Sequence, residues 1–353
     1  THLEFSDLAR PLPAGENFSD WIRSVIAYRQ EQRTGTEDLP TTDESHLHQT
    51  VRQGLQQSTQ SGVTTVGEIS TLPETHAWYQ NCGVQTVLFQ EVLGLSADRI
   101  DELLKKAAFH IADRGSASPP CEVGLSPHAP YSIHCDLLQR VCQLAADSNV
   151  PCALHLAESR AEMELLETGS GPLREMLEAL QVWDSSAIPK GISPLDYLRW
   201  MRDTPRALII HGNFLVAQEH EFLAQHADRM SLIYCPRTYH HFQDNPYPLQ
   251  TILDRGVLVA LGTDSRASNP DLNLFAEMQY IAQAHPTVDP ALLLRIGTLH
   301  GARALGLEST TGSIEAGKRA DLITVACDPQ SPSQLSEAMT SPESRVEGVM
   351  SAG

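Results

Sequence analysis

Polar side chains that follow buried strands constrain this chain more than any other feature of its sequence. The apolar segment Cys152–Leu156 predicts a buried strand, yet it contains His155, and Glu158 follows three residues later. An imidazole and a carboxylate are costly to bury without hydrogen-bond partners. A single histidine of this kind is more often a hydrogen-bonded structural residue, so its interpretation depends on whether other strands end in the same way.

Four other predicted strands also end in an ionisable side chain. These are His128 after Cys121–Leu125, His211 after Ala207–Ile210, Arg237 after Met230–Tyr234, and Asp264 after Val257–Leu261. If the strands run parallel in a barrel, their ends meet at one mouth, where barrel enzymes place their chemistry. Imidazoles and a carboxylate around one point suit a transition metal, with zinc or iron favoured over magnesium.

Strands and helices alternate along the chain, which predicts parallel strands joined by right-handed crossovers. Two further strands, Val63–Val66 and Val84–Val92, bring the number before residue 265 to seven. A (β/α)8 barrel needs eight, so the first strand would have to precede Thr1 and end near His2. Helices are predicted at 18–33, 46–61, 96–114, 135–147, 216–226, 248–255, 272–285 and 290–305, with helical pieces in 160–204.

Composition narrows the possible partners. The net charge of −19 argues against nucleic acids and anionic membranes, because both favour basic surfaces. Seven cysteines without a CxxC pair predict reduced thiols and a cytoplasmic location. No apolar segment approaches the roughly 18 residues of a membrane span. We therefore expect a small-molecule substrate, and the sequence leaves open a homo-oligomer.

Two motifs that resemble known sites can be excluded. The segment Gly312–Lys318 has the spacing of a P-loop, but Arg319 replaces the hydroxyl residue that holds magnesium, and a strand rather than a helix is predicted to follow. The PCxxC signature of nucleotide deaminases is absent, because neither Cys121 nor Cys152 has a second cysteine three residues later. The strand ends remain the better candidate site.

Taken in order, these motifs resemble the amidohydrolase superfamily. Thr1–Glu4 is similar to the end of an HTHLE motif, and it is followed by His155-Leu-Ala-Glu158, His211, Gly262-Thr-Asp-Ser265 and Gly312–Asp321. The resemblance implies an α/β fold: a distorted TIM barrel over residues 1–306 and a partial β-sandwich over 307–353. The first barrel strand and the amino-terminal half of the sandwich would precede Thr1 and are missing from this chain.

The resemblance also implies one divalent metal, with zinc favoured over iron, held by His2, His155 and Asp264. The first histidine of the HxH motif would precede Thr1, so one ligand is missing. Two-metal members use a bridging lysine, and Cys121–Ser132 contains none. Glu158 would move a proton between a metal-activated water and the substrate, assisted by His211 and by Asp264.

Substrate contacts are expected from Glu4, His128, Arg237 and Ser265, with Arg237 suited to a carboxylate or phosphate. The resemblance is to the one-metal deaminases, of the adenosine and the cytosine or guanine type. Thr1–Ser6, Trp21–Ile26 and Cys235–Arg237 are further similar to aminofutalosine deaminases of a menaquinone route. We therefore expect deamination of an aminated, purine-nucleoside-like heterocycle. The alternatives are amide or C–Cl hydrolysis at the same site, and a non-catalytic barrel with a degenerate metal site, which the retention of Glu158 argues against.

Overall fold

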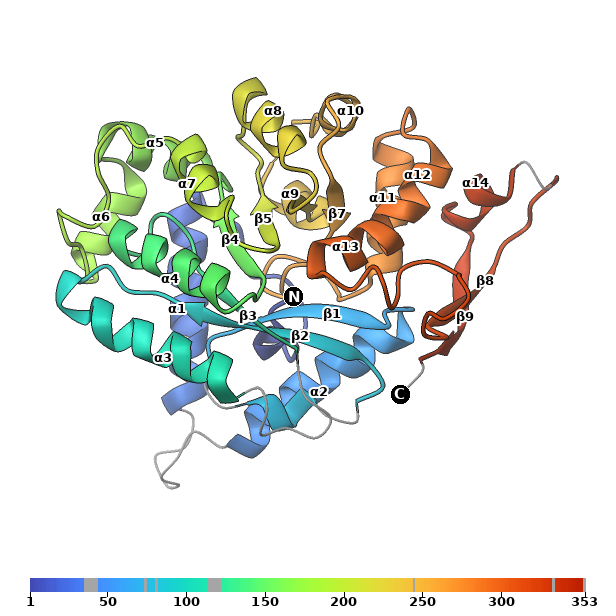
Figure 1. The fold of residues 1–353 in the computed structure, drawn as a ribbon, viewed down its shortest axis with the longest axis horizontal. Coiled ribbons are helices and arrows are strands. Elements are labelled where there is room, and N and C mark those ends of the chain that lie inside the picture. The colour runs from blue at the N-terminus through green and yellow to red at the C-terminus, as the bar shows by residue number, and fades with distance from the viewer. Residues whose placement is uncertain are drawn as a thin grey trace.

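A curled sheet of seven parallel strands organises the computed structural model (Figure 1). The structure describes residues 1–34, 44–72, 75–79, 82–113, 122–243, 245–331 and 334–351. The strands pair in chain order and are β1 (Thr65–Ser70), β2 (Gln85–Val92), β3 (Glu122–Pro127), β4 (Cys152–Leu156), β5 (Ala207–His211), β6 (Met230–Tyr234) and β7 (Val259–Leu261). All seven predicted strands are therefore confirmed, and so is the expected distorted TIM-barrel fold.

The chain start lies against the free edge of this sheet, as Figure 1 shows for the end marked N. The amino group of Thr1 donates to the carbonyl oxygen of Gly67 at 2.9 Å, and the Ile69 N–H donates to the carbonyl oxygen of Thr1 at 2.9 Å. These bonds hold His2 beside the carboxyl end of β1. The segment thus occupies the position in which the predicted eighth strand would end.

The strands are apolar on both faces because each face is covered. Every residue of β4, β5 and β6 is buried, as is usual for parallel strands inside an α/β protein. In β5, Leu208 and Ile210 belong to the cluster inside the barrel, whereas Ile209 belongs to the layer between sheet and helices. This alternation decides which strand-end side chains face the barrel interior.

Helices surround the sheet, and several of them begin and end at typical capping residues. Ser159, Asn273 and Asp289 cap helix N-termini with their side chains, and Gly169 and Gly306 end helices in the left-handed conformation. The helices are α1 (Phe18–Thr34), α2 (Glu44–Gln60), α3 (Ile100–Asp113), α4 (Cys135–Asp147), α5 (Arg160–Thr168), α6 (Pro172–Ala179), α7 (Pro194–Met201), α8 (Ala217–Gln225), α9 (Pro236–Phe242), α10 (Leu249–Asp254), α11 (Leu274–Ala284), α12 (Pro290–Arg295) and α13 (Gly301–Leu305). Short 3-10 turns lie at η1 (Leu3–Phe5), η2 (His76–Tyr79) and η3 (Ala97–Arg99).

Several local predictions need correction. The strand predicted at Val63–Val66 starts later and runs on through Ser70. The helix predicted at 96–114 begins with the 3-10 turn η3, and its α-helical part, α3, starts at Ile100. The single helix predicted at 290–305 contains a π-helical turn, η4 (Ile296–His300). His240 and His241 lie in the last turn of α9, although no helix is predicted between 226 and 248.

The last part of the chain forms a separate small sheet, seen at one side of Figure 1. Strands β8 (Leu322–Ala326) and β9 (Arg345–Met350) pair antiparallel, and α14 (Leu335–Met339) lies between them in the chain. The domain boundary between residues 306 and 307 stays a prediction. Among the described residues, no helix has both the length and the apolar character that crossing a membrane requires.

Candidate active site

The predicted metal and catalytic residues come together at the carboxyl ends of the strands. The Nε2 atom of His2 lies 3.2 Å from Nε2 of His155 and 3.8 Å from Oδ1 of Asp264. The Nε2 atom of His211 lies 3.4 Å from Oε1 of Glu158. Ligand atoms of Glu158, His211 and Asp264 all lie within 4.8 Å of one another. The five side chains therefore surround one small, buried volume.

Unusual backbone conformations aim these side chains. Ala157, His211 and Asp264 have positive φ angles of 53°, 69° and 55°. Each left-handed residue that is not glycine costs about 1–2 kcal/mol, and such residues gather where a site demands them. Regular alternation along β5 would turn His211 to the outer layer. The left-handed conformation breaks that alternation, and the His211 ring lies 5.5 Å from the His155 ring inside the barrel.

The residue after His211 is glycine because a side chain there would collide with Leu232. Gly212 also has a positive φ, 59°, and a Cβ added there would lie 2.5 Å from the side chain of Leu232. Its N–H donates to the carbonyl oxygen of Leu156 at 3.0 Å. The close turn thereby ties the end of β5 to the end of β4, where Glu158 follows.

A second glutamate, Glu162, holds the turn that carries Glu158. Its carboxylate accepts the N–H of Ala157 at 2.7 Å and the N–H of Glu158 at 2.9 Å, while Ser159 Oγ accepts the Glu162 N–H at 3.1 Å. Burial raises the pKa of Glu162 to about 7. The sequence analysis missed this residue, although the Ser159-x-x-Glu162 spacing is that of a capping box.

The donor atoms of His2, His155 and Asp264, and the two distances from His2 to the other residues, suit a metal ion. The Nδ1 atom of His155 lies 2.9 Å from the carbonyl oxygen of His128, so Nδ1 carries the proton and Nε2 presents a lone pair. Ligands about 2.0 Å from a tetrahedral ion lie about 3.3 Å apart, close to the 3.2 and 3.8 Å observed. The hydrogen bond from His155 Nδ1 to the carbonyl oxygen of His128 is of the kind that usually orients a metal-ligating imidazole.

Burial sets the protonation states of these groups. It lowers the pKa of His155 to about 4 and of His211 to about 3, and together with the nearby His155 it holds the pKa of His2 well below the usual value. Neutral imidazoles are the forms that bind metals. Burial, the Asp264 carboxylate and Glu162 raise the pKa of Glu158 well above its usual value. Glu158 is thus a buried carboxyl group with a strong tendency to hold a proton.

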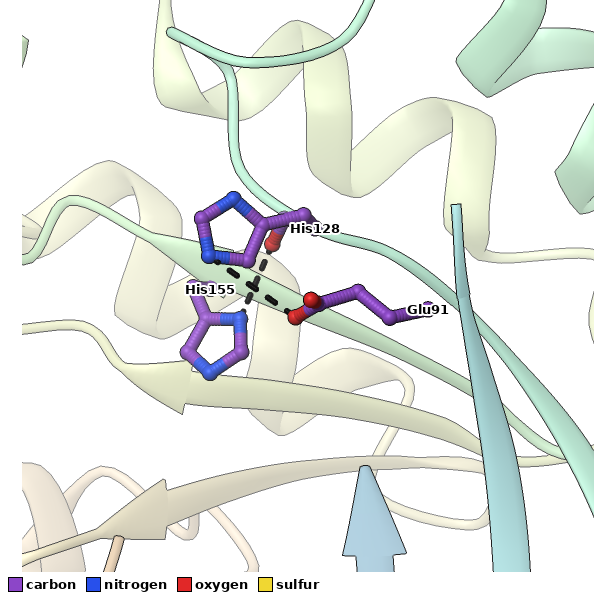
Figure 2. Close-up of side chains that lie close together, drawn as sticks. All are labelled: Glu91, His128 and His155. Atoms are coloured by element: carbon purple, nitrogen blue, oxygen red, sulfur yellow. Dashed lines mark hydrogen bonds and ion pairs between the residues drawn. The ribbon is translucent and has the colours of Figure 1, made fainter. Parts of the chain in front are cut away.

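His128 lies in a second group of side chains, drawn in Figure 2 with Glu91 and His155. The Nδ1 atom of His128 lies 2.6 Å from Ser132 Oγ, and Nε2 lies 3.8 Å from Oε1 of Glu91. Burial raises the pKa of Glu91 to about 8. The sequence analysis missed Glu91; the signal it could have used is a carboxylate within the apolar strand β2.

The remaining predicted substrate residues are engaged within the protein. The Glu4 carboxylate accepts hydrogen bonds from Arg29 at 2.7 Å and from Thr71 at 2.9 Å. Ser265 is buried, and its hydroxyl oxygen accepts the Ala267 N–H at 3.2 Å. Substrate contacts by these two residues stay predictions.

Arg237 does not present a free guanidinium to a substrate. Its Nε donates to Glu277 at 2.7 Å and its NH1 donates to Asp271 at 3.1 Å. Glu277 is fully buried and also accepts the side-chain N–H of Asn269 at 2.7 Å. Asn269 in turn donates to the carbonyl oxygen of Thr263 at 2.8 Å, next to Asp264. These contacts join the ends of β6 and β7, and the substrate contact predicted for Arg237 stays a prediction.

Comparisons with known proteins agree with this geometry. The profile described as "Amidohydrolase family" matches residues 1–353. An aminodeoxyfutalosine deaminase of Deinococcus radiodurans is 29% identical over 72% of this chain and 62% of its own, and a 5-methylthioadenosine/S-adenosylhomocysteine deaminase of Moorella thermoacetica is 30% identical over 86% and 66%. The chain thus spans slightly less than two thirds of the length of these two relatives.

The fold also matches a solved structure along its whole length. The crystal structure of Helicobacter pylori aminofutalosine deaminase in complex with methylthio-coformycin superposes with a TM-score of 0.83 at 25% identity, covering 100% of this chain and 83% of that chain. The order of motifs, the barrel and the family profile lead to one conclusion. The chain belongs to the amidohydrolase family.

Proposed function

We propose that this chain is a metal-dependent aminohydrolase that replaces the amino group of a purine-nucleoside-like heterocycle by oxygen. The observation that carries the proposal is the buried Glu158 carboxyl group 3.4 Å from His211 and beside the candidate metal ligands. A carboxyl group whose pKa is raised by burial is suited to pick up and release a proton during a reaction.

His2, His155 and Asp264 would hold the metal, and their nitrogen and carboxylate donors favour zinc over magnesium, with iron as the second choice. When bound, such an ion lowers the pKa of a water molecule and so supplies a nucleophile near neutral pH. We propose a single ion, because the segment around β3 that carries a bridging lysine in two-metal members has none.

The protein residues account for the movement of protons. Glu158 takes one proton from the attacking water and delivers it to the ring nitrogen beside the amine-bearing carbon. Asp264 passes the second water proton to the amino group, which leaves as ammonia. His211 stays neutral because burial lowers its pKa to about 3, and its ring N–H stabilises the oxygen that develops negative charge.

Deamination is favoured over amide or C–Cl hydrolysis by the relatives named above, which are deaminases by name. Within that class we propose aminodeoxyfutalosine, and hence a menaquinone route, because the solved aminofutalosine deaminase covers the whole chain. We also propose that the protein acts on a small molecule, is located in the cytoplasm and forms a homo-oligomer.

The proposal is tested by measuring ammonia release from aminodeoxyfutalosine, adenosine, 5′-methylthioadenosine and S-adenosylhomocysteine with the natural full-length protein. We expect release from at least one of them, loss of the activity on chelation and its return with zinc. Release that persists in metal-free protein would contradict the role of the ion. Hydrolysis of amide or chlorinated substrates without any ammonia from the adenine compounds would favour the alternative chemistry.

A further inference from the structure

Glu68 is a carboxyl group buried in an apolar layer outside the barrel, and the proposed mechanism does not use it. Side chains of a strand alternate between its two faces. Ile69 belongs to the cluster inside the barrel, whereas Val66 belongs to the cluster between the sheet and helix α2. Glu68 lies on the face of Val66 and is fully buried. Burial raises the pKa of this carboxyl group to about 8, so its charged form is unfavourable there.

The two oxygens of Glu68 bind the residues on either side of His2. Oε1 accepts the Leu3 N–H at 2.8 Å, and Oε2 lies 2.6 Å from the Thr1 hydroxyl oxygen. The carbonyl oxygen of Thr1 also accepts the Ile69 N–H at 2.9 Å. One side chain of β1, supported by the backbone of the next residue, therefore fixes the chain before and after His2.

The His2 ring lacks the hydrogen bond that orients the ring of His155. His155 Nδ1 lies 2.9 Å from the carbonyl oxygen of His128, which is the kind of support that metal-ligating imidazoles usually have. His2 Nδ1 is buried and has no hydrogen-bond partner among the described residues. The direction in which His2 presents Nε2 therefore depends on its backbone, and Glu68 holds that backbone.

Folding stability alone does not explain a carboxyl group at this position. The cluster that surrounds it is apolar and contains Leu55, Val66 and Leu88. A polar group is costly to bury, and an apolar side chain would suit this layer better. The cost is understandable if the two hydrogen bonds of Glu68 serve His2.

We propose that Glu68 is a positioning residue that fixes the backbone on both sides of His2 and so aims its imidazole at the candidate metal site. This inference rests on the proposed metal site and adds a residue to it that touches neither the ion nor the substrate. Residues that orient metal ligands without binding the metal are typically worth about 10–100-fold in metal affinity. Glu68 should act at this scale.

The test compares the zinc affinity of Glu68→Met and Glu68→Gln with that of the natural full-length protein, measured by competition with a chelator. Methionine has a similar length and suits the apolar layer, but it removes both hydrogen bonds. We therefore expect the affinity to fall at least about tenfold. Glutamine keeps both: its oxygen accepts the Leu3 N–H, and its NH2 group donates to the Thr1 hydroxyl, which then donates to the carbonyl oxygen of Gly67, 3.4 Å away. Its affinity should stay within about threefold of the natural value.

Glu219→Met is the matched control. Glu219, on helix α8, is also a buried carboxyl group that accepts a backbone N–H, from Val216 at 3.1 Å. This variant should lose stability and keep its zinc affinity, which separates the support of His2 from general destabilisation. Natural zinc affinity in Glu68→Met would overturn the inference. An equal loss in both methionine variants would also overturn it, and so would a loss in Glu68→Gln as large as that in Glu68→Met.

A second measurement does not need the ion. Hydrogen exchange of the metal-free protein, followed by mass spectrometry of the peptide that contains Leu3, reports the bond to Glu68. The Leu3 amide should exchange at least about tenfold faster in Glu68→Met and at the natural rate in Glu68→Gln. If the natural protein binds no zinc, the proposed metal site fails, and the role of Glu68 in fixing the backbone around His2 then stands or falls with this exchange.

Circular dichroism checks that each variant is folded. If Glu68→Met is not, Thr1→Val takes its place, because it removes one of the two bonds of Glu68 and keeps the shape of the threonine side chain. Its zinc affinity should fall about fivefold, and an unchanged affinity would overturn the inference.

Discussion

Three glutamates near the candidate site have the same side chain and different environments. The carboxylate of Glu162 accepts two backbone N–H groups and holds a turn. Glu91 lies behind His128 with one oxygen unpartnered. Glu158 faces His211 in the barrel interior, next to the candidate metal ligands. Their partners, rather than their residue type, therefore separate the support that Glu162 gives to a turn from the proton transfer proposed for Glu158.

Replacing Glu158 by Gln should lower kcat by at least about a hundredfold, because proton transfer by a positioned side chain is worth about 10²–10⁴ in rate. Glutamine keeps the size of the side chain but cannot carry the proton. The variant should still bind zinc, and its melting temperature should equal that of the natural protein. Glu167→Gln, at an exposed position on the adjoining helix α5, is the control and should be fully active. Loss of zinc would instead make Glu158 a ligand, and near-normal turnover would leave it a structural carboxyl group.

At the scale of elements, the ends of β6 and β7 are joined through one buried carboxylate. Glu277, from helix α11, binds both Arg237 and Asn269, and Asn269 holds the carbonyl oxygen before Asp264. A buried carboxylate is tolerated only while it is paired. The position of the candidate metal ligand Asp264 therefore depends on Arg237, which lies at the start of helix α9.

Arg237→Ala should destabilise the protein by about 3 kcal/mol or more, because it leaves Glu277 buried without its cation. Arg237→Lys should recover part of this loss, since lysine restores the charge but not the planar fork of donors. The double variant Arg237→Ala with Glu277→Gln should be more stable than Arg237→Ala alone. Urea unfolding measures all three. An increase in KM at unchanged stability would instead return Arg237 to the role of a substrate contact.

The sequence predicted the strands and their ionisable ends well, because period, propensity and chain order are local properties. It misplaced β1 because Gly67 and Glu68 do not look like strand residues. Glu68 is fully buried there, and its carboxylate binds the Thr1 hydroxyl at 2.6 Å and the Leu3 N–H at 2.8 Å. The partners of Arg237 were missed for another reason. Their roles depend on contacts between segments far apart in the chain, which no local pattern records.

At the scale of the whole molecule, a metal ion would connect distant parts of the chain. His2 and His155 are 153 residues apart and come from the chain start and from β4, and Asp264 follows β7. The unfolded chain cannot hold these ligands together. Binding therefore adds to the stability of the whole fold by mass action.

Zinc should stabilise the metal-free protein by about 4 kcal/mol at a thousandfold excess over its dissociation constant. Differential scanning calorimetry of the natural full-length protein should show this as a melting temperature several degrees higher. His155→Asn should abolish the shift, whereas His240→Asn, at an exposed position in α9, should retain it. A shift of equal size in both variants would place the ion elsewhere.

Stability should also fall in acid through His110, which lies away from the candidate site on helix α3. Its Nε2 contacts the carbonyl oxygen of Leu88, and its ring stacks on His76, itself 3.3 Å from Asp113. Burial lowers the pKa of His110 from 6.5 to about 4. The unfolded chain therefore binds more protons than the folded one in this interval, and acid favours unfolding.

Above pH 6.5 the free energy of unfolding does not depend on His110 protonation. As the pH falls from 6.5 to about 4, the free energy of unfolding decreases, and the total decrease is about 3 kcal/mol. Urea unfolding of the metal-free protein at several pH values should show this loss. A His110→Gln variant should lose about that much less over the same range. Parallel curves for the two proteins would mean that His110 does not titrate differently in the folded and unfolded states.

Selection for heat resistance alone would act against the chemistry proposed for this protein. The left-handed backbones of Ala157, His211 and Asp264 are held at a cost of about 1–2 kcal/mol each, and Gly or Asn would relieve it. A library screened only for melting temperature should therefore collect Ala157→Gly together with inactive replacements of His211. A library screened for ammonia release should keep the first and discard the second. The difference between the two collections would show how much stability the fold gives up to aim its candidate catalytic groups.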